Sequence, residues 1–140
     1  MNKKTIIELV NEVSNNNLSD VLRDDSKYGS NSREVGISQF ISLANACKIA
    51  DCVDEVKLLL EYKTAKGNGW EKNVVRKKFG ELIIDKVNRI ETTIDESLGD
   101  KEIDSNKADE LEKEKLKAIS QFFGYLYWKA KVITSNKRGN

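Results

Sequence analysis

The chain has 140 residues, of which 39% are hydrophobic and 34% charged, and it contains no proline and no histidine; its formal net charge is +1. No apolar run approaches the roughly 18 residues that a membrane-spanning helix needs, and glutamates interrupt the apolar part of the basic N-terminus, which argues against a secretory signal. One cytoplasmic domain over residues 1–140 is therefore expected, and the lack of proline favours helices.

The N-terminal part predicts a helix, a short helical piece and a linker. Thr5 and Glu8 have the spacing of a capping box, so the first helix is expected to begin there. Residues 15–17, three asparagines, end or interrupt this helix, and a short piece follows up to Leu22. Residues 24–36 have turn chemistry and almost no apolar side chain, so a mobile linker is expected.

Apolar spacing predicts two more helices in the middle of the chain. The second helix is expected to begin near Gly36, and the third is expected from Asp51 to Lys66. Gly67 and Gly69 make a continuous helix costly, so a turn is expected between Lys66 and the next helix.

The C-terminal half predicts two long helices. A fourth helix is expected from about Trp70, because apolar residues between positions 75 and 94 fall on one helical face. After a break at 97–106, the last helix is expected from about Lys107 to Thr134, with a frayed polar tail at 135–140. The predicted fold is an all-α, single-domain bundle of about five helices with short connections.

The last helix carries two apolar stripes. The first is a core stripe: Ile119, Phe122, Phe123, Leu126, Ala130 and Ile133. The second lies on nearly the opposite side: Gln121, Tyr125, Trp128 and Val132. Two interpretations are open: a central helix packed on both sides, or a protein interface, where Tyr and Trp are favoured. Ser120 and Gly124 lie between the stripes and would let another backbone come close.

The sequence offers no catalytic constellation. Without histidine, Ser-His and Cys-His nucleophile pairs are excluded, and with only Cys47 and Cys52 as thiols a metal site is not expected. Acidic neighbours such as Asp54 and Glu55 point in different directions on a helix. We therefore expect no enzyme activity, no metal and no cofactor.

The polar segment most typical of a binding site is residues 63–78. It places cations around the predicted turn, and we expect these residues to contact RNA: Lys63, Lys66, Trp70, Lys72, Arg76 and Lys77. Lys72 and Arg76 are four apart and would share a helix face, with Trp70 available to stack on a base. Lys63 and Lys66 also suit a helix C-terminus, and Trp70 also suits a core position.

Charge alternates along the chain. Residues 57–90 carry 9 basic and 4 acidic groups, and residues 91–114 carry 3 and 10. Residues 115–140 carry 6 basic groups and no acidic group, whereas residues 1–56 carry 6 and 9. Such blocks suit ion-paired helix faces and also suit a surface for a polyanion.

Four segments occur in an order that resembles a known family. They are an Ile-x-x-Phe core at 37–40, a Leu-rich helix ending in Tyr and Lys at 58–63, a Phe-x-x-Leu-Ile segment at 79–83 and a Phe- and Tyr-rich segment at 119–127. Over residues 35–133 this pattern resembles the small subunit of type III CRISPR effector complexes of the Csm type. Where family members often have basic residues, the first segment has Ser38 and Gln39, so a strand contact there would be made by neutral hydrogen bonding.

The resemblance implies a structural, RNA-binding role in antiviral defence. Several copies would stack head to tail in the ribonucleoprotein, line the groove that holds the guide RNA–target RNA duplex, and contact the larger subunits. The partners would be guide RNA and target RNA through backbone contacts, other subunits of the effector complex and copies of the chain itself. The alternative is a helical protein–protein adaptor or regulator, such as an inhibitor or antitoxin-like bundle, that binds no nucleic acid.

Overall fold

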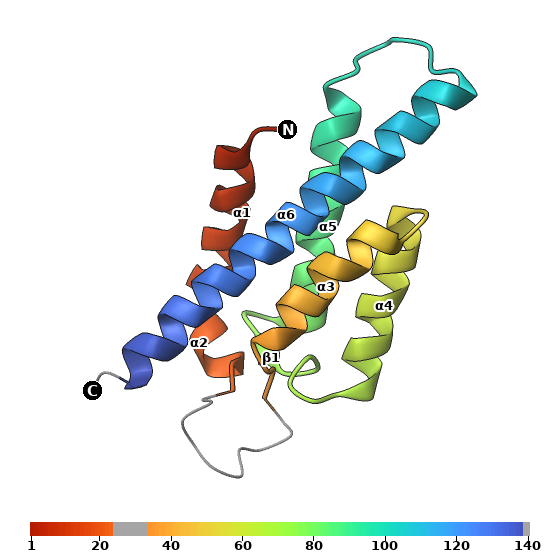
Figure 1. Cartoon of the computed structure of the whole chain (residues 1–140). Coiled ribbons are helices and arrows are strands. Elements are labelled where there is room, and N and C mark those ends of the chain that lie inside the picture. The colour runs from red at the N-terminus through yellow and green to blue at the C-terminus, as the bar shows by residue number, and fades with distance from the viewer. Residues whose placement is uncertain (24–33, 139–140) are drawn as a thin grey trace.

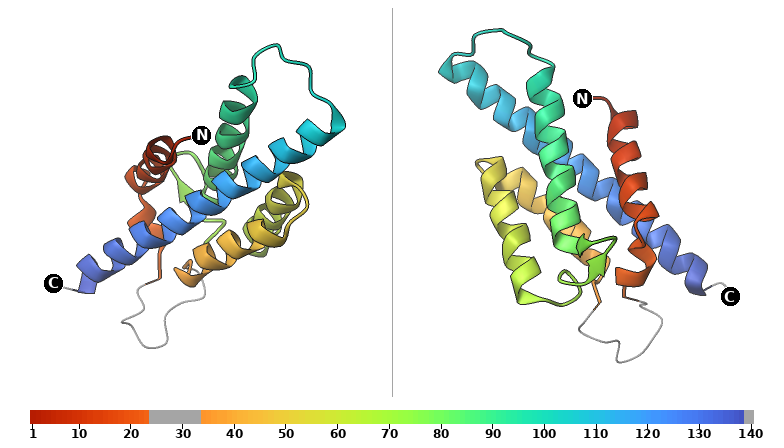
Figure 2. Two further views of the ribbon diagram at one scale, coloured as in Figure 1. Left: turned by 45° about the horizontal axis from the view of Figure 1, so that its top comes forward. Right: turned by 180° about the vertical axis from the view of Figure 1, so that it is seen from behind.

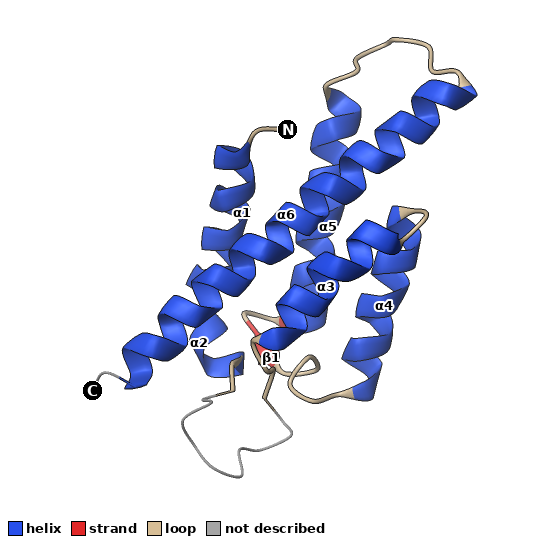
Figure 3. Cartoon of the chain, in the orientation of Figure 1, coloured by secondary structure: helices blue, strands red, loops and turns tan. Residues whose placement is uncertain are grey.

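The structure, a computed structural model, describes residues 1–23 and 34–138, with the side chains of residues 137 and 138 left out. This part of the chain forms six helices and one two-stranded hairpin (Figures 1 and 3): α1 Lys3–Asn15, α2 Leu18–Val21, α3 Ser38–Ile49, α4 Val53–Lys66, β1 Asn73–Val74, β2 Lys77–Lys78, α5 Phe79–Glu96 and α6 Ser105–Arg138. The prediction of a mostly helical bundle is confirmed.

The helices pack in two layers around α6. Helix α6 has 34 residues and runs across the whole molecule. Helix α3 packs against α6 along much of its own length. Helices α1, α5 and α4 lie side by side in the other layer (Figure 2). The hairpin lies at the N-terminal end of α5, and the α5–α6 connection lies at the opposite end of the bundle (Figure 1). No helix in the described residues is both long and apolar enough to cross a membrane.

The core uses all four phenylalanines of the chain. Phe40, Phe79, Phe122 and Phe123 are fully buried, on α3, α5 and α6. The rings of Phe122 and Phe123 lie 5.4 Å apart. Burying each such side chain contributes about 1.5–3 kcal/mol, so the core stripe of α6 supplies a large share of the driving force for folding.

The bounds of two predicted segments are corrected by the structure. Helix α1 begins at Lys3, because the side chain of Asn2 accepts a hydrogen bond from the Thr5 amide at 2.8 Å. The linker predicted at 24–36 is wrong at its end, because Val35 is buried and pairs with Leu22 in a parallel bridge. Residues 24–33 lie outside the described residues.

The predicted frayed tail is also wrong over most of its length. Helix α6 continues through Arg138, four residues beyond Thr134, and of the predicted tail only residues 139 and 140 lie outside the described residues. Thr134 is buried, so this part of the helix packs against the bundle, and its hydroxyl donates within the helix to the Ala130 carbonyl at 3.1 Å.

Ion pairs connect three helices on one side of the bundle. Glu91 of α5 pairs with Lys57 of α4, and its other oxygen lies 3.7 Å from the ammonium of Lys115 on α6. Lys115 also reaches Asp95 at 2.8 Å. Burial alone would lower the pKa of Lys115, but the hydrogen bond and charge of Asp95, with Glu91, raise it above its ordinary value. The acidic and basic segments therefore meet partly within the molecule.

Candidate nucleic-acid interface

The predicted basic segment folds as a turn followed by a hairpin. Helix α5 begins at Phe79, so the prediction of a helix from Trp70 is wrong. Gly67, Asn68 and Gly69 all have positive φ angles, and a Cβ on Gly69 would lie 2.7 Å from the Val35 amide. Asn73 then pairs with Lys78, and Val74 pairs with Lys77. Lys72 lies just before β1 and Arg76 lies in the turn of the hairpin, so these two residues do not share a helix face as expected.

Trp70 belongs to the core. Its side chain is 2% exposed, and its ring lies 6.1 Å from the ring of Phe40 and 5.2 Å from that of Phe79. The expectation that Trp70 stacks on a base is therefore wrong, because its ring faces are covered by these neighbours. The other interpretation of Trp70, a core position, is confirmed.

The hairpin presents four cations with different surroundings. Lys72 donates to the backbone oxygen of Asp20 at 2.6 Å, and Lys77 pairs with Asp85. The hydrogen bond and charge of Asp85 raise the pKa of Lys77. Arg76 and Lys78 are exposed, and neither forms an ion pair with a described residue. Arg76 in the turn and Lys78 at the end of β2 are thus the cations of the hairpin most accessible to an anion.

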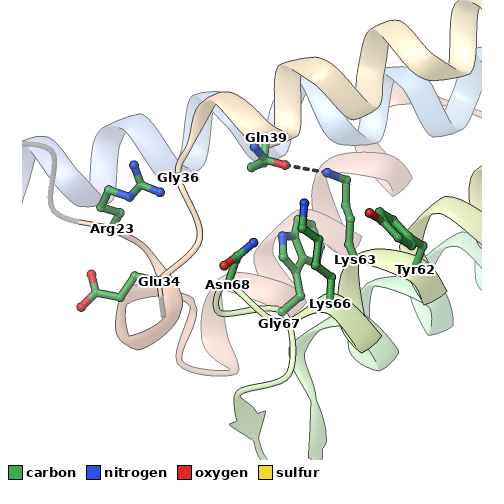
Figure 4. Close-up of a pocket in the computed structure, with 10 residues that line it drawn as sticks. Arg23, Glu34, Gly36, Gln39, Tyr62, Lys63, Lys66, Gly67 and Asn68 are labelled. Atoms are coloured by element: carbon green, nitrogen blue, oxygen red, sulfur yellow. Dashed lines mark hydrogen bonds between the residues drawn. The ribbon is translucent and has the colours of Figure 1, made fainter. Parts of the chain in front are cut away.

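Lys63 and Lys66 lie apart from the hairpin and line a cavity of about 350 Å³ between α3 and the end of α4 (Figure 4). The ammonium of Lys63 donates to Gln39 at 2.6 Å and lies 5.9 Å from the centre of the Trp70 ring. Burial, and secondarily the charge of Lys66, lower the pKa of Lys63. The ammonium of Lys66 lies 5.8 Å from the centre of the Tyr62 ring. The cavity therefore holds two cations close to each other.

The cavity also contains residues that sequence reasoning did not select. Arg23, two residues after the end of α2, is brought to it by the pairing of the Arg23 amide with the Val35 carbonyl at 2.7 Å. Gln39 and Tyr62 complete the polar wall. Their positions in the motifs at 37–40 and 58–63 were the available signal for these two, but no local pattern pointed to Arg23.

The second stripe of α6 is exposed toward its C-terminal end. Trp128 is 65% exposed and Val132 is 54% exposed, whereas Gln121 and Tyr125 are half-buried. The rings of Tyr125 and Trp128 meet edge to face with 5.5 Å between their centres. Because two of its four residues face solvent, this stripe is not a second core face over its whole length.

The two small residues between the stripes have different neighbours. The hydroxyl of Ser120 donates to the Ala44 carbonyl at 2.9 Å, so here the backbone of α3 comes close. A Cβ on Gly124 would meet no atom within 4 Å. Nearby, Cys47 lies in the α3–α6 contact, and burial raises the pKa of its thiol to about 12, which suits an unreactive core residue.

Comparisons with known proteins found no match: no family model, no curated protein and no solved structure matches this chain. Among the described residues, no three Cys, Asp or Glu side chains come together in a way that would hold a metal ion. The cavity, the hairpin and the exposed stripe of α6 are therefore the features from which a function is argued.

Proposed function

We propose that this chain is a non-catalytic structural subunit of a type III CRISPR effector complex of the Csm type. In this proposal the hairpin follows the phosphate backbone of the guide RNA–target RNA duplex, and the exposed part of α6 contacts neighbouring protein. The observation that carries it is the tight hairpin at residues 73–78, with Arg76 exposed in its turn, Lys77 and Lys78 on β2, and Lys72 just before β1.

The hairpin supports backbone contact for two reasons. Its cations lie on a short hairpin at the N-terminal end of α5 (Figure 2), where the side chains of Arg76 and Lys78 are exposed and a phosphate chain could reach them. Lys and Arg contacts to phosphates release counterions and carry no sequence information, as expected for a subunit that binds any guide.

The arrangement of charge supports assembly from several copies. The end of α5 and the first ten of the 34 residues of α6 fall in the acidic block 91–114, and the rest of α6 falls in the basic block 115–140. These blocks lie toward opposite ends of the long helix (Figure 1), so one copy can present its basic end to the acidic end of the next.

Changing Lys72, Arg76 and Lys77 together to Glu tests the RNA contact. The unchanged chain should bind a labelled single-stranded RNA without sequence preference, and more weakly as salt rises. The triple variant should bind at least about tenfold more weakly, because fewer cations then neutralise phosphates and fewer counterions are released on binding. Fluorescence anisotropy at two salt concentrations measures both effects, and circular dichroism checks the fold.

A charge-matched control uses three exposed lysines far from the hairpin: Lys3, Lys4 and Lys101, each changed to Glu. This variant has the same net charge as the first, and we expect it to retain most of the affinity. Equal losses in the two variants would show that net charge alone governs binding and that the hairpin has no special role.

The exposed stripe of α6 favours a second candidate, an adaptor that binds protein only. Trp128→Ala should abolish partner capture from cells that make the protein, because truncating an exposed interface tryptophan often costs 2 kcal/mol or more, a rough figure for hot spots. Ile7→Ala, which truncates an exposed apolar residue on α1, is the control. Under this candidate the captured material contains no nucleic acid by ultraviolet absorbance, whereas RNA in it supports the first proposal.

A further inference from the structure

We propose that the cavity between α3 and the end of α4 binds a nucleoside monophosphate group, with the phosphate held by Arg23, Lys63 and Lys66 and the base placed against Tyr62. The ligand is either a free nucleotide or the phosphorylated end of an RNA strand. This site is distinct from the backbone contact at the hairpin, and it does not depend on that contact.

The shape and charge of the cavity fit a small anion. Its volume of about 350 Å³ lies near the lower end of the range for small-molecule sites. Arg23 lies on one side of it, and Lys63 and Lys66 lie on the other (Figure 4). Glu34 is the one acidic residue among the lining side chains, and its carboxylate points away from the two lysines in this view. The wall therefore has a net positive charge.

Arg23 provides an independent observation. Its Nε atom is buried, and no group in the described residues accepts a hydrogen bond from it. A buried donor without an acceptor is costly, so native structures seldom leave one unpaired unless a water or ion completes it. The guanidinium lies against Gly36, where a Cβ would be 3.5 Å from its Cζ atom. In this proposal a small shift of the side chain toward the cavity lets an oxygen of a bound phosphate supply the missing acceptor.

The favourable interaction with the C-terminus of α4 does not by itself explain the positions of both Lys63 and Lys66. Cations in the last turn of α4 are favoured by the helix dipole, which is sufficient for Lys66 at the surface. Lys63, however, turns inward, donates to a neutral amide and is close enough to Lys66 for that charge to lower its pKa. Two lysines kept close without a carboxylate between them are stabilised by a shared anion.

The aromatic rim supports a nucleotide as the carrier of the phosphate. Tyr62 is 59% exposed at the edge of the cavity, and an exposed ring can stack on any base. The arginine fork and two ammonium groups match the oxygens and charge of a phosphate monoester better than a single carboxylate. Asn68, also at the rim, offers an amide for a ribose hydroxyl or a base edge.

Titration calorimetry on the full chain tests the proposal with AMP, adenosine and inorganic phosphate as probes. We expect AMP to bind at least about tenfold more tightly than adenosine, because the charged hydrogen bonds are made by the phosphate. Arg23→Gln and Lys66→Gln should each weaken AMP about tenfold or more. Lys113→Gln, at an exposed lysine of α6 outside the cavity, should leave AMP binding unchanged.

Two RNA strands of one sequence, with a 5′-phosphate or a 5′-hydroxyl, separate the sources of the ligand. Tighter binding of the phosphorylated strand, lost in Arg23→Gln, identifies an RNA end; AMP binding without this difference identifies a free nucleotide. Either result supports the site. Equal affinity for AMP and adenosine, no binding of AMP, or an Arg23→Gln variant that folds and binds AMP normally would overturn it. Because the 5′-hydroxyl strand reports on the hairpin alone, failure of one proposal leaves the other testable.

Discussion

Two glycines within helices show how differently the same residue type is used. In the first turn of α5, a Cβ on Gly80 would lie 1.6 Å from the hydroxyl oxygen of Thr64, so α4 and α5 touch at this point. In the middle of α6, a Cβ on Gly124 would meet no atom within 4 Å. The first glycine is required by packing within the chain, whereas nothing in the described residues requires the second.

Alanine at these positions should therefore have opposite effects on stability. Gly80→Ala is expected to lower the free energy of unfolding by about 1–3 kcal/mol, because the added methyl overpacks the α4–α5 contact. Gly124→Ala is expected to raise it by about 1 kcal/mol, since alanine is the better helix former. Urea denaturation of the two variants measures both effects.

The outcome for Gly124 also bears on the surface it occupies. It lies beside Tyr125 and four residues before the exposed Trp128. If Gly124→Ala is more stable yet captures less partner, the glycine serves the close approach of another chain. A loss of stability would instead show that this position is closed in solution by a contact within the chain.

At the level of elements, the hairpin was the feature least accessible from sequence. Its turn residues, Val75 and Arg76, both have positive φ angles, of 42° and 72°. Such turns usually use Asn-Gly or similar pairs, and a β-branched residue is disfavoured in this conformation. Apolar spacing continued from Val75 into α5, so the periodicity of the helix concealed the strands. Lys72 and Arg76 were consequently placed on a helix that does not include them.

Val75→Asn is expected to stabilise the protein by about 0.5–1 kcal/mol, because asparagine tolerates the left-handed conformation better than valine. The valine side chain is 57% exposed, so its removal gives up little buried area. Denaturant midpoints provide the measurement, and Val75→Leu is the control that keeps an apolar side chain. A less stable Val75→Asn variant would contradict the proposed strain. RNA affinity should not change, since Arg76 is kept.

The long helices α5 and α6 were predicted well, because each buries one face and its apolar residues therefore recur at helical spacing. The apolar face expected between residues 75 and 94 is buried in α5 from Phe79 onward, and the core stripe of α6 lies against the other helices. The cavity was not predictable in the same way. Arg23 is brought to it by the parallel bridge between Leu22 and Val35, a pairing between residues separated by a segment without apolar periodicity. Tertiary pairing of this kind leaves no local signal in the sequence.

At the scale of the whole molecule, Lys115 links α5 and α6 through Asp95 and Glu91. Lys115→Met is expected to lower the free energy of unfolding by about 1–2 kcal/mol near neutral pH, because Asp95 is half-exposed and Glu91 keeps Lys57 as a partner. Lys113→Met, at an exposed position without an ion pair among the described residues, should change it by less than about 0.5 kcal/mol.

The pH dependence of this difference follows from the raised pKa of Lys115. A lysine with a raised folded-state pKa stabilises the protein fully below the ordinary value of 10.5, and this contribution is lost as the pH rises through the folded-state value. The difference between the unchanged chain and Lys115→Met should therefore narrow above pH 10.5. A gap that stayed constant through this range would mean that packing of the methylene chain, and not the charge, stabilises the fold.

The separation of charge along α6 has a consequence for how the molecule meets its partners. The hairpin and the basic end of α6 lie away from the acidic α5–α6 connection (Figure 1), so the molecule has a permanent electric dipole along its long dimension. In the field of a polyanion this dipole experiences a torque that turns the basic end forward before the surfaces touch. The electrostatic interaction would thus orient the molecule relative to a polyanion before the two surfaces touch. Salt screens this interaction over roughly 8 Å at physiological ionic strength.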